Sequence, residues 1–345
     1  MLTRILVVIP TLNEAGGIAQ VLADLRRDLP VPSTVTFVVA DGGSSDATPA
    51  IVRRLMRERG DLRLLHNTRR IQSAAVNLAV KQFGDGMDVL IRCDAHAVYP
   101  PGYVRLLFES LQQHGAAAVV VPMDSLGDTC LRRAVAWVSD TPVGSGGSAH
   151  RGGRSSGFVD HGHHAAFRMA AFLQAGGYDE SFSHNEDAEF DCRQRALGQR
   201  IYLDAGIRIG YQPRGSLGGL WRQYLAYGRG RSRTIRKHPA SLRARQLAVP
   251  LHLVACALAL LLAPWWPLLL LWPALYLGVL ALTGVVLAVQ HRSACGLLAA
   301  PVAATLHTAW ALGLFVGLLT VREPRWHPPQ PAQPSEAALS RGSPQ

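Results

Sequence analysis

Several short polar clusters carry side chains that can bind a metal ion or a phosphate and accept a proton. Asp94 and His96 are two residues apart, Asp41 begins the run 41–46, and Glu186 precedes Asp187. In an extended stretch, residues i and i+2 point to the same side, so Asp94 and His96 could hold one divalent ion. A carboxylate such as that of Asp187 can take the proton of an attacking hydroxyl group. These residue types predict a site that binds a charged ligand and transfers a proton.

Each cluster also has a simpler structural explanation. An Asp-Gly-Gly-Ser sequence such as residues 41–44 is typical of a turn. Asp94 and His96 can be two polar residues of a loop. The acidic residues of 186–191 are also favoured at the N-terminal turn of a helix. No single cluster therefore identifies a site.

The elements that would position these clusters follow from the hydrophobic pattern. Residues 5–10, 34–40 and 89–92 are apolar runs that predict buried strands. Helical patterns follow the first two strands, and this alternation predicts an α/β domain with a mostly parallel sheet. Polar residues come directly after each strand, at 11–15, 41–48 and 93–96. Because ligands bind beyond the carboxyl ends of parallel strands, we expect these clusters to converge on one site.

The positive charge of the chain is concentrated in one segment. The net charge is +11, yet residues 205–245 hold ten basic residues and no acidic one. A nucleic-acid-binding protein usually spreads its positive charge over a folded face, so this pattern argues against nucleic acid as a partner. The charge instead comes immediately before an apolar C-terminal third, which indicates contact with a membrane surface.

Three apolar runs follow the basic segment, at residues 247–263, 268–289 and 297–320. A bilayer core needs about 20 apolar residues per helix, so about three membrane helices are expected over 247–320. The alternative is that they are buried helices of a soluble domain. The predicted organisation is a catalytic domain (1–204), a basic juxtamembrane segment (205–246), the membrane region (247–320) and a Pro-rich tail (321–345).

The charge bias also predicts an orientation. Basic residues favour the cytoplasmic side, so a multi-pass protein of the bacterial inner membrane with a cytoplasmic catalytic domain is expected. Three crossings would place the tail outside, whereas Arg322 and Arg325 weigh against that placement. The five cysteines are widely spaced and include no CxxC pair. They indicate neither a disulfide framework nor a zinc site, and predict a reducing compartment.

The motifs as a set resemble those of family 2 glycosyltransferases. Residues 9–14, 41–46 and 94–96 are similar to the nucleotide-sugar-binding motifs of that family, and residues 184–190 resemble its Glu-Asp motif. Residues 70–77 and 160–180 resemble the ExoA-type branch that takes part in succinoglycan biosynthesis. The resemblance covers roughly residues 4–235. It implies a GT-A (Rossmann-like) catalytic domain followed by C-terminal transmembrane helices.

The resemblance assigns residues of the donor site. It implies that Pro10 and Thr11 line the nucleotide pocket, that Glu14 holds the ribose hydroxyls and that Asp41 accepts a hydrogen bond from the base. Arg70 would lie near the diphosphate, although Arg69 and Arg70 could also be a solvated surface pair.

The resemblance also implies a divalent metal cofactor, Mg²⁺ or Mn²⁺. Asp94 and His96 occupy the positions of the family's Asp-x-Asp metal motif, with histidine in place of the second aspartate. His96 is then either a direct ligand or a contact to a phosphate. The ion would stabilise the charge that develops on the leaving group.

Asp187 is the expected catalytic base of an inverting transfer, in which one carboxylate takes the proton of the acceptor hydroxyl. Like charges on Glu186 and Asp191 are expected to raise its pKa. The family's Gln-x-x-Arg-Trp motif is absent, and residues 223–229 stand in its place. The acceptor or diphosphate side is expected to include His163, His164, Glu186, Trp221, Gln223, Tyr227 and Arg229.

The function that these features predict is a membrane-bound inverting glycosyltransferase of exopolysaccharide or cell-surface glycan synthesis. It would move a sugar from a nucleotide-sugar, with a UDP-sugar expected, to a lipid-linked saccharide. One alternative is transfer of a single sugar to a polyprenyl phosphate, and another is a non-catalytic membrane protein that binds nucleotide-sugars. A transporter is disfavoured because residues 247–320 contain no acidic residue.

Overall fold

The computed structural model describes residues 2–146, 155–163 and 165–328. The strands are β1 (Thr3–Thr11), β2 (Ser33–Asp41), β3 (Leu62–His66), β4 (Val89–Arg92), β5 (Ala118–Val120), β6 (Met123–Ser125), β7 (Gly157–Val159), β8 (Ala165–Arg168), β9 (Ile201–Leu203) and β10 (Ile209–Tyr211). The helices of the N-terminal part are α1 (Ile18–Leu25), α2 (Thr48–Glu58), α3 (Gln72–Phe83), α4 (Tyr103–Gln113), α5 (Cys130–Ser139), α6 (Pro142–Ser145), α7 (Met169–Gln174) and α8 (Glu186–Ala196). The C-terminal helices are α9 (Leu217–Lys237), α10 (Arg245–Leu262), α11 (Leu271–Gln290) and α12 (Ala299–Thr320).

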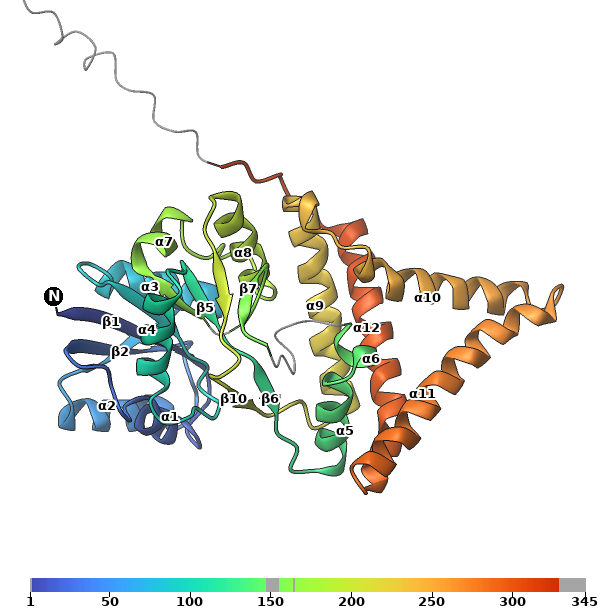
Figure 1. Ribbon diagram of the computed structural model, residues 1–345, viewed down its shortest axis with the longest axis horizontal. Helices are drawn as coiled ribbons and strands as arrows, with labels where there is room; N and C mark the ends of the chain where they lie inside the picture. Colours follow the sequence, from blue (N-terminus) through green and yellow to red (C-terminus); the bar gives the residue numbers. More distant parts are fainter. Residues whose placement is uncertain (1, 147–154, 164, 329–345) are drawn as a thin grey trace, which may run out of the picture.

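A mostly parallel sheet forms the centre of the N-terminal domain (Figure 1). In the described part of the chain it has eight strands in the order β3-β2-β1-β4-β8-β5-β9-β7. β1 runs parallel to β2 and β4, whereas β8 runs antiparallel to β4 and β5. The predicted α/β class with a mostly parallel sheet is therefore confirmed. The register aligns Thr11 with Asp41 and Asp41 with His66, so the first three strands end at one level and their loops lie side by side.

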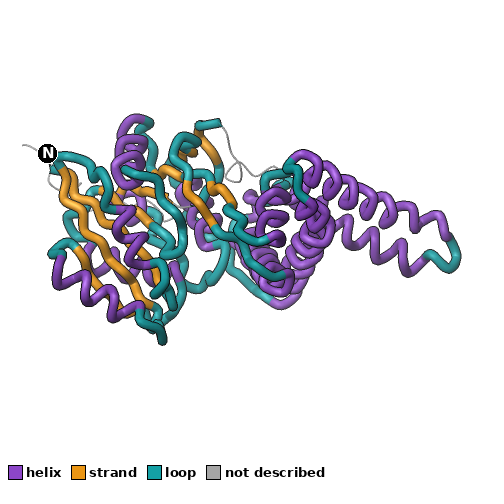
Figure 2. The backbone as a smooth tube through the Cα atoms, turned by 90° about the horizontal axis from the view of Figure 1, so that it is seen from below, coloured by secondary structure: helices purple, strands orange, loops and turns teal. Residues whose placement is uncertain are grey.

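Helices cover both faces of this sheet (Figure 2). α1, α2 and α4 bury Leu22, Val52 and Leu107 against one face. α3, α7 and α8 bury Val76, Phe172 and Phe190 against the other. Both faces of the sheet are thus removed from water. Polar side chains therefore gather at the carboxyl ends of its parallel strands.

The C-terminal part contains three segments that are long and apolar enough to cross a membrane, Arg245–Leu262, Pro267–Gln290 and Ala294–Thr320. α10 and α11 project from the rest of the molecule and meet at a tip (Figures 1 and 2). Trp265 and Trp266 lie between these helices and are 69% and 62% exposed, which suits residues of a membrane interface. Within the molecule the first two segments are only 11% buried, whereas the third is 44% buried. The third segment therefore has a different environment from the other two.

α12 packs closely beside α9 through glycines. A Cβ atom added at Gly228 would lie 2.1 Å from the carbonyl oxygen of Trp310, and one added at Gly313 would lie 2.1 Å from that of Leu225. Small residues at such positions let two helix backbones approach closely. The two helices run in the same direction, because the contact moves from Leu225 and Gly313 to Ser232 and Gly317.

Both ends of α12 contact the rest of the domain. Near its beginning, Val302 and Ala303 belong to one apolar cluster with Ala134 and Val138 of α5. Near its end, Arg236 donates a hydrogen bond to the carbonyl oxygen of Leu318. Beyond the helix, Glu323 forms an ion pair with Arg233 of α9. The described residues after α12 therefore lie beside α9.

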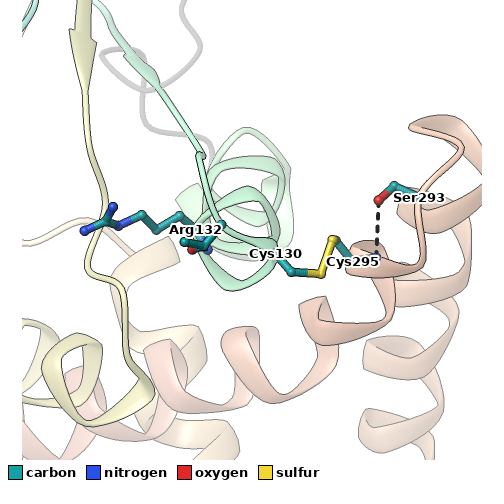
Figure 3. Close-up of a disulfide and its surroundings, with 5 residues drawn as sticks. Cys130, Arg132, Ser293 and Cys295 are labelled. Carbon is teal, nitrogen blue, oxygen red and sulfur yellow. Dashed lines mark hydrogen bonds between the residues drawn. A yellow bond between two sulfur atoms is a disulfide. The ribbon is translucent and has the colours of Figure 1, made fainter.

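A disulfide bond joins the N-terminal domain to the turn before α12 (Figure 3). Cys130 at the start of α5 is bonded to Cys295, with their Cα atoms 5.0 Å apart. The expectation of no disulfide was wrong, because the pair is 165 residues apart in sequence and meets only when α12 docks on α5. Since disulfides form in oxidising compartments, the cysteines give no support to the predicted reducing compartment.

A buried carboxylate links α8 to the end of α9. Glu189 is 0% exposed and accepts hydrogen bonds from Arg193. It also lies 3.0 Å from both Lys237 Nζ and His238 Nε2. Burial by itself would raise the pKa of Glu189, but the bonds to His238 and Arg193 and the charge of Lys237 outweigh it and lower the pKa to about 2. This cluster holds the acidic helix against the basic one.

Replacing Gly313 with leucine should disrupt the packing of α9 on α12, because the new side chain would overlap the backbone of Leu225. We expect the midpoint of thermal unfolding in detergent to fall by roughly 4–10 °C. Gly278→Leu in α11 is the matched control, since no atom lies within 4 Å of a Cβ added there. Equal midpoints for the two variants would contradict the close packing.

The Glu189 cluster predicts a loss of stability in acid. A carboxylate whose pKa is lower in the folded state stabilises the fold above its unfolded pKa of about 4.3, and that contribution is lost as the pH falls through the folded pKa. With a folded pKa of about 2, the loss should occur between about pH 5 and pH 2. When unfolding is followed by circular dichroism, the unfolding free energy of Glu189→Gln should fall less than that of the wild type between about pH 5 and pH 2. Glu109→Gln, at an exposed ion pair with Arg105, should show the same dependence of the unfolding free energy on pH as the wild type.

Candidate active site

A cleft of about 460 Å³ lies at the carboxyl ends of the first strands. Of the residues predicted for the donor and metal sites, Pro10, Thr11, Glu14, Arg70 and His96 line it. Its other lining residues are Leu12, Ala40, Gly42, Asn67, Ile71, Gln72, Tyr211, Gln212 and Arg214. The structure thus brings together residues at the ends of five strands, β1, β2, β3, β4 and β10, or in the loops that follow them. Arg214, which the sequence reasoning missed, places a second guanidinium beside Arg70 in the lining.

Asp41 shapes the wall of this cleft through hydrogen bonds within its own turn. One carboxylate oxygen accepts from the N–H groups of Gly43 and Ser44, at 3.0 and 3.1 Å. The other accepts from the hydroxyl of Ser44 at 2.5 Å. The side chain is 5% exposed, and its neighbours Ala40 and Gly42 line the cleft. Asp41 therefore fixes the loop that follows β2.

The loops around the cleft hold two residues in the left-handed backbone region. Asn13 has a φ of 57° and Arg70 a φ of 58°. Such a conformation costs about 1–3 kcal/mol and persists only where surrounding contacts enforce it. Asn13 accepts a hydrogen bond from the N–H of Ser45, and Arg70 donates its N–H to the carbonyl oxygen of Asn67. The first bond connects the loops after β1 and β2, and the second lies within the loop after β3 that carries Arg70.

Glu14 and His96 form a pair across the cleft. Oε1 of Glu14 lies 3.0 Å from Nδ1 of His96, which is 48% exposed. The hydrogen bond to Glu14 raises the pKa of His96, and burial opposes it only in part. With Nδ1 directed at a carboxylate, Nε2 is the ring nitrogen that can face a ligand.

Arg92 connects the cleft to the acidic helix α8. It ends strand β4, is 1% exposed, and lies 3.2 Å from Glu186 and 3.9 Å from Asp94. Its guanidinium also donates to the side-chain oxygen of Gln72 at 2.5 Å. Burial raises the pKa of Glu186, and the neighbouring Asp187 adds to this effect. Sequence reasoning missed Arg92, although a charged residue that ends an apolar strand was a usable signal.

Asp187 is in contact with a histidine. Its carboxylate lies against Nδ1 of His163, and Nε2 of the same ring lies 4.0 Å from Asp94. The expectation that neighbouring carboxylates raise the pKa of Asp187 was wrong. Burial by itself would raise it, but His163, with His161 and Arg92, holds the pKa of Asp187 well below its usual range. The carboxylate is therefore ionised at neutral pH.

The other predicted acceptor-side residues lie on α9, and His164 lies outside the described residues. Gln223 donates hydrogen bonds to the hydroxyl oxygens of Tyr211, at 3.2 Å, and Tyr227, at 3.0 Å. Since Tyr211 lines the cleft, these two residues of α9 adjoin its wall. Trp221 and Arg229 also lie on α9 but do not line the cleft.

The residues around Asp94 fit a metal ion that binds together with its substrate. In the described segments, no group of three His, Cys, Asp or Glu side chains could hold an ion by itself. The two predicted ligands, Asp94 and His96, would leave the remaining coordination positions of an ion to phosphate oxygens and water. The carboxylate of Glu14 behind His96 is the arrangement expected around a metal-ligating histidine.

Residues 6–175 match the family described as "Glycosyl transferase family 2". Over 324 residues, the chain is 43% identical to the succinoglycan biosynthesis protein ExoA of Rhizobium meliloti (strain 1021), covering 93% of this chain and 96% of ExoA. Its fold resembles that of the mannosyltransferase PcManGT from Pyrobaculum calidifontis, solved in complex with GDP-Man and Mn²⁺. That comparison has a TM-score of 0.64 at 21% identity, covering 93% of this chain and 88% of PcManGT.

Replacing Arg92 with methionine should destabilise the fold, because it leaves Glu186 buried without its positive partner. Breaking a buried ion pair in this way typically costs about 3–5 kcal/mol, which denaturant unfolding in detergent can measure. Adding Glu186→Gln should recover part of the loss. Arg53→Met, at an exposed position of α2, should change the unfolding free energy little. An Arg92→Met variant as stable as this control would show that the pair does not hold the two elements together.

Proposed function

Because the chain belongs to glycosyltransferase family 2, we propose that it is a membrane-bound inverting enzyme that moves a sugar from a nucleotide-sugar to a lipid-linked saccharide. The observation that carries the proposal is the position of Asp94. It follows strand β4, two residues before His96 of the cleft lining, and its carboxylate lies 4.0 Å from His163, which contacts Asp187. A proton acceptor is therefore adjacent to the place where a leaving diphosphate would be held.

The donor would occupy the cleft of about 460 Å³, with a UDP-sugar as the expected form. Pro10 and Thr11 would line the nucleotide, and Glu14 would bind the ribose, since a carboxylate can accept several hydrogen bonds besides its contact with His96. Arg70 and Arg214 would make charge-assisted bonds to the diphosphate. Asp41 would act by positioning the base-binding loop.

Mg²⁺ or Mn²⁺ would be held by Asp94 and His96, with diphosphate oxygens as further ligands. When bound, such an ion neutralises charge on the departing diphosphate. The donor set supports this proposal because Glu14 orients His96 from behind. Removal of divalent ions should therefore weaken donor binding as well as transfer.

Transfer would be a single displacement. The acceptor oxygen forms a bond to the anomeric carbon while the bond from that carbon to the diphosphate oxygen breaks, so the configuration inverts. The nucleoside diphosphate leaves with the electron pair of the broken bond. The proton of the acceptor hydroxyl passes to the pair formed by Asp187 and His163. Glu186, held by Arg92, would keep this end of α8 in place.

The acceptor side would be formed by His163, Glu186 and the residues Gln223 and Tyr227 of α9, with Trp221 and Arg229 on the same helix. His164 is proposed for this side on the resemblance alone. The 43% identity to the succinoglycan biosynthesis protein ExoA supports a role in exopolysaccharide synthesis. A saccharide on a lipid carrier is an acceptor that a membrane enzyme of such a process can use.

The enzyme would reside in the bacterial inner membrane with its catalytic domain in the cytoplasm. Ten basic residues in 205–245 support this orientation, whereas the Cys130–Cys295 disulfide, a bond that forms in oxidising compartments, weighs against it. The projecting helices α10 and α11, with two exposed tryptophans between them, would enter the bilayer. α12 lies against α9, whose last turn contains Arg236 and Lys237, so it would remain with the catalytic domain.

Asp187→Asn should retain nucleotide-sugar binding and lose sugar transfer by about 10²–10⁴-fold, because the proton acceptor is removed. Membranes are incubated with UDP-, GDP- and dTDP-sugars, and the labelled lipid fraction is analysed by mass. A lipid that gains its sugar beyond existing sugars supports the proposal, whereas a polyprenyl phosphate carrying one sugar favours the alternative.

Calorimetric titration of the purified variant with the active donor checks that the cleft is intact. Asp128→Asn, at an exposed ion pair with Arg132, is the matched control and should transfer normally. If Asp187→Asn transfers sugar at the wild-type rate, the base is misassigned.

A further inference from the structure

A second cavity, of about 260 Å³, lies at the junction of α8, α9 and α10. Four arginines line it, Arg195 of α8, Arg231 of α9, Arg243, and Arg245 at the start of α10. Its other lining residues are Val159, Asp160, His161, Ala188, Cys192, Ser241 and Gln246. None of the four arginines belongs to the donor cleft.

The positive charge of this cavity exceeds the negative charge around it. Asp160 is the single carboxylate among the described lining residues, and it pairs with both Arg195, at 3.5 Å, and Arg243. His161 adds a further basic group, whose Nδ1 lies 2.7 Å from Asp191 behind it. Four guanidiniums at one cavity repel each other unless an anion joins them.

Two donors in the cavity wall are buried and unused. Arg231 is 8% exposed. One of its terminal nitrogens donates hydrogen bonds to the carbonyl oxygen of Ser241 and, at 2.9 Å, to the side-chain oxygen of Gln246. The Nε atoms of Arg231 and Arg195 are buried and have no hydrogen-bond partner among the described residues. Burial, with the charges of Arg195, Arg243 and Arg245, lowers the pKa of Arg231 to about 10. Both guanidiniums are therefore incompletely hydrogen-bonded within the described part of the protein.

The cavity lies next to the proposed acceptor side. Ala188, Cys192 and Arg195 are spaced i, i+4 and i+7 on one stripe of α8, and Ala188 directly follows Asp187. From Asp187 to Arg195 the helix advances about 12 Å. At its other end the cavity reaches Arg245, where the projecting helix α10 begins. It therefore connects the place of proton transfer with the place where the chain would meet a membrane.

We propose that this arginine cavity binds the diphosphate of the lipid-linked acceptor. The proposal rests on the proposed function, which it deepens by locating the acceptor. Arginine suits the ligand because its planar donors match phosphate oxygens. The advance of about 12 Å along α8 from Asp187 to Arg195 leaves room for a sugar between the bound diphosphate and the reacting hydroxyl. The lipid chain would leave along α10 and α11.

The test uses the full-length protein in phosphatidylcholine nanodiscs, with farnesyl diphosphate as the probe and calorimetry as the readout. Arg195→Gln combined with Arg245→Gln should weaken binding at least about tenfold. The control, Arg53→Gln with Arg54→Gln, removes the same charge from an exposed part of α2 and should bind as wild type. Arg195→Lys with Arg245→Lys keeps the charge and should bind more tightly than the glutamine variant but less tightly than wild type, which separates loss of charge from loss of fold.

Unchanged binding by the glutamine variant would overturn the proposal. It would also be overturned if phosphatidylglycerol nanodiscs abolished binding of the probe to the wild type, since bilayer headgroups would then occupy the cavity. The readout needs no sugar donor. A wild-type protein that binds the probe through these arginines but transfers no sugar would support the cavity and refute the proposed function.

Discussion

The arrangement of the site depends on one buried charge. Arg92 is 1% exposed, and a guanidinium in such a place is costly unless carboxylates and hydrogen-bond acceptors surround it. Glu186, Asp94 and Gln72 supply them, and they come from α8, the loop after β4 and α3. Arg92 therefore links the donor edge of the sheet to the helix that carries Asp187. The proposed sites of proton transfer and of diphosphate binding thus share a support inside the fold.

The sequence predicted what depends on local pattern. Apolar runs that end in polar residues indicated the strand ends, and the register of Thr11 with Asp41 brings their loops together. The sequence could not predict the contact of His163 with Asp187. The two residues are 24 positions apart and meet only through tertiary packing. That contact reverses the expected direction of the pKa of Asp187. The disulfide and the arginine cavity were missed for the same reason.

The hydropathy pattern predicted the same membrane environment for three apolar helices, but their surroundings in the structure differ. α10 and α11 expose most of their surface, but α12 packs through Gly313 and Gly317 on a helix rich in arginine. Length and composition identify an apolar segment, but they do not show which other helix it packs against. Glycines spaced four apart were the sequence signal for a close helix contact. In the proposed arrangement, the part of the molecule that enters the membrane is therefore smaller than its apolar part.

The disulfide between Cys130 and Cys295 restricts how the chain can thread a bilayer. Two sulfur atoms bonded to each other cannot lie on opposite sides of a hydrocarbon core about 30 Å thick. The polypeptide between the N-terminal domain and residue 295 must then traverse the core an even number of times. In the proposed membrane arrangement, α10 and α11 would therefore both cross the bilayer or both stay outside it, whichever leaflet the domain faces.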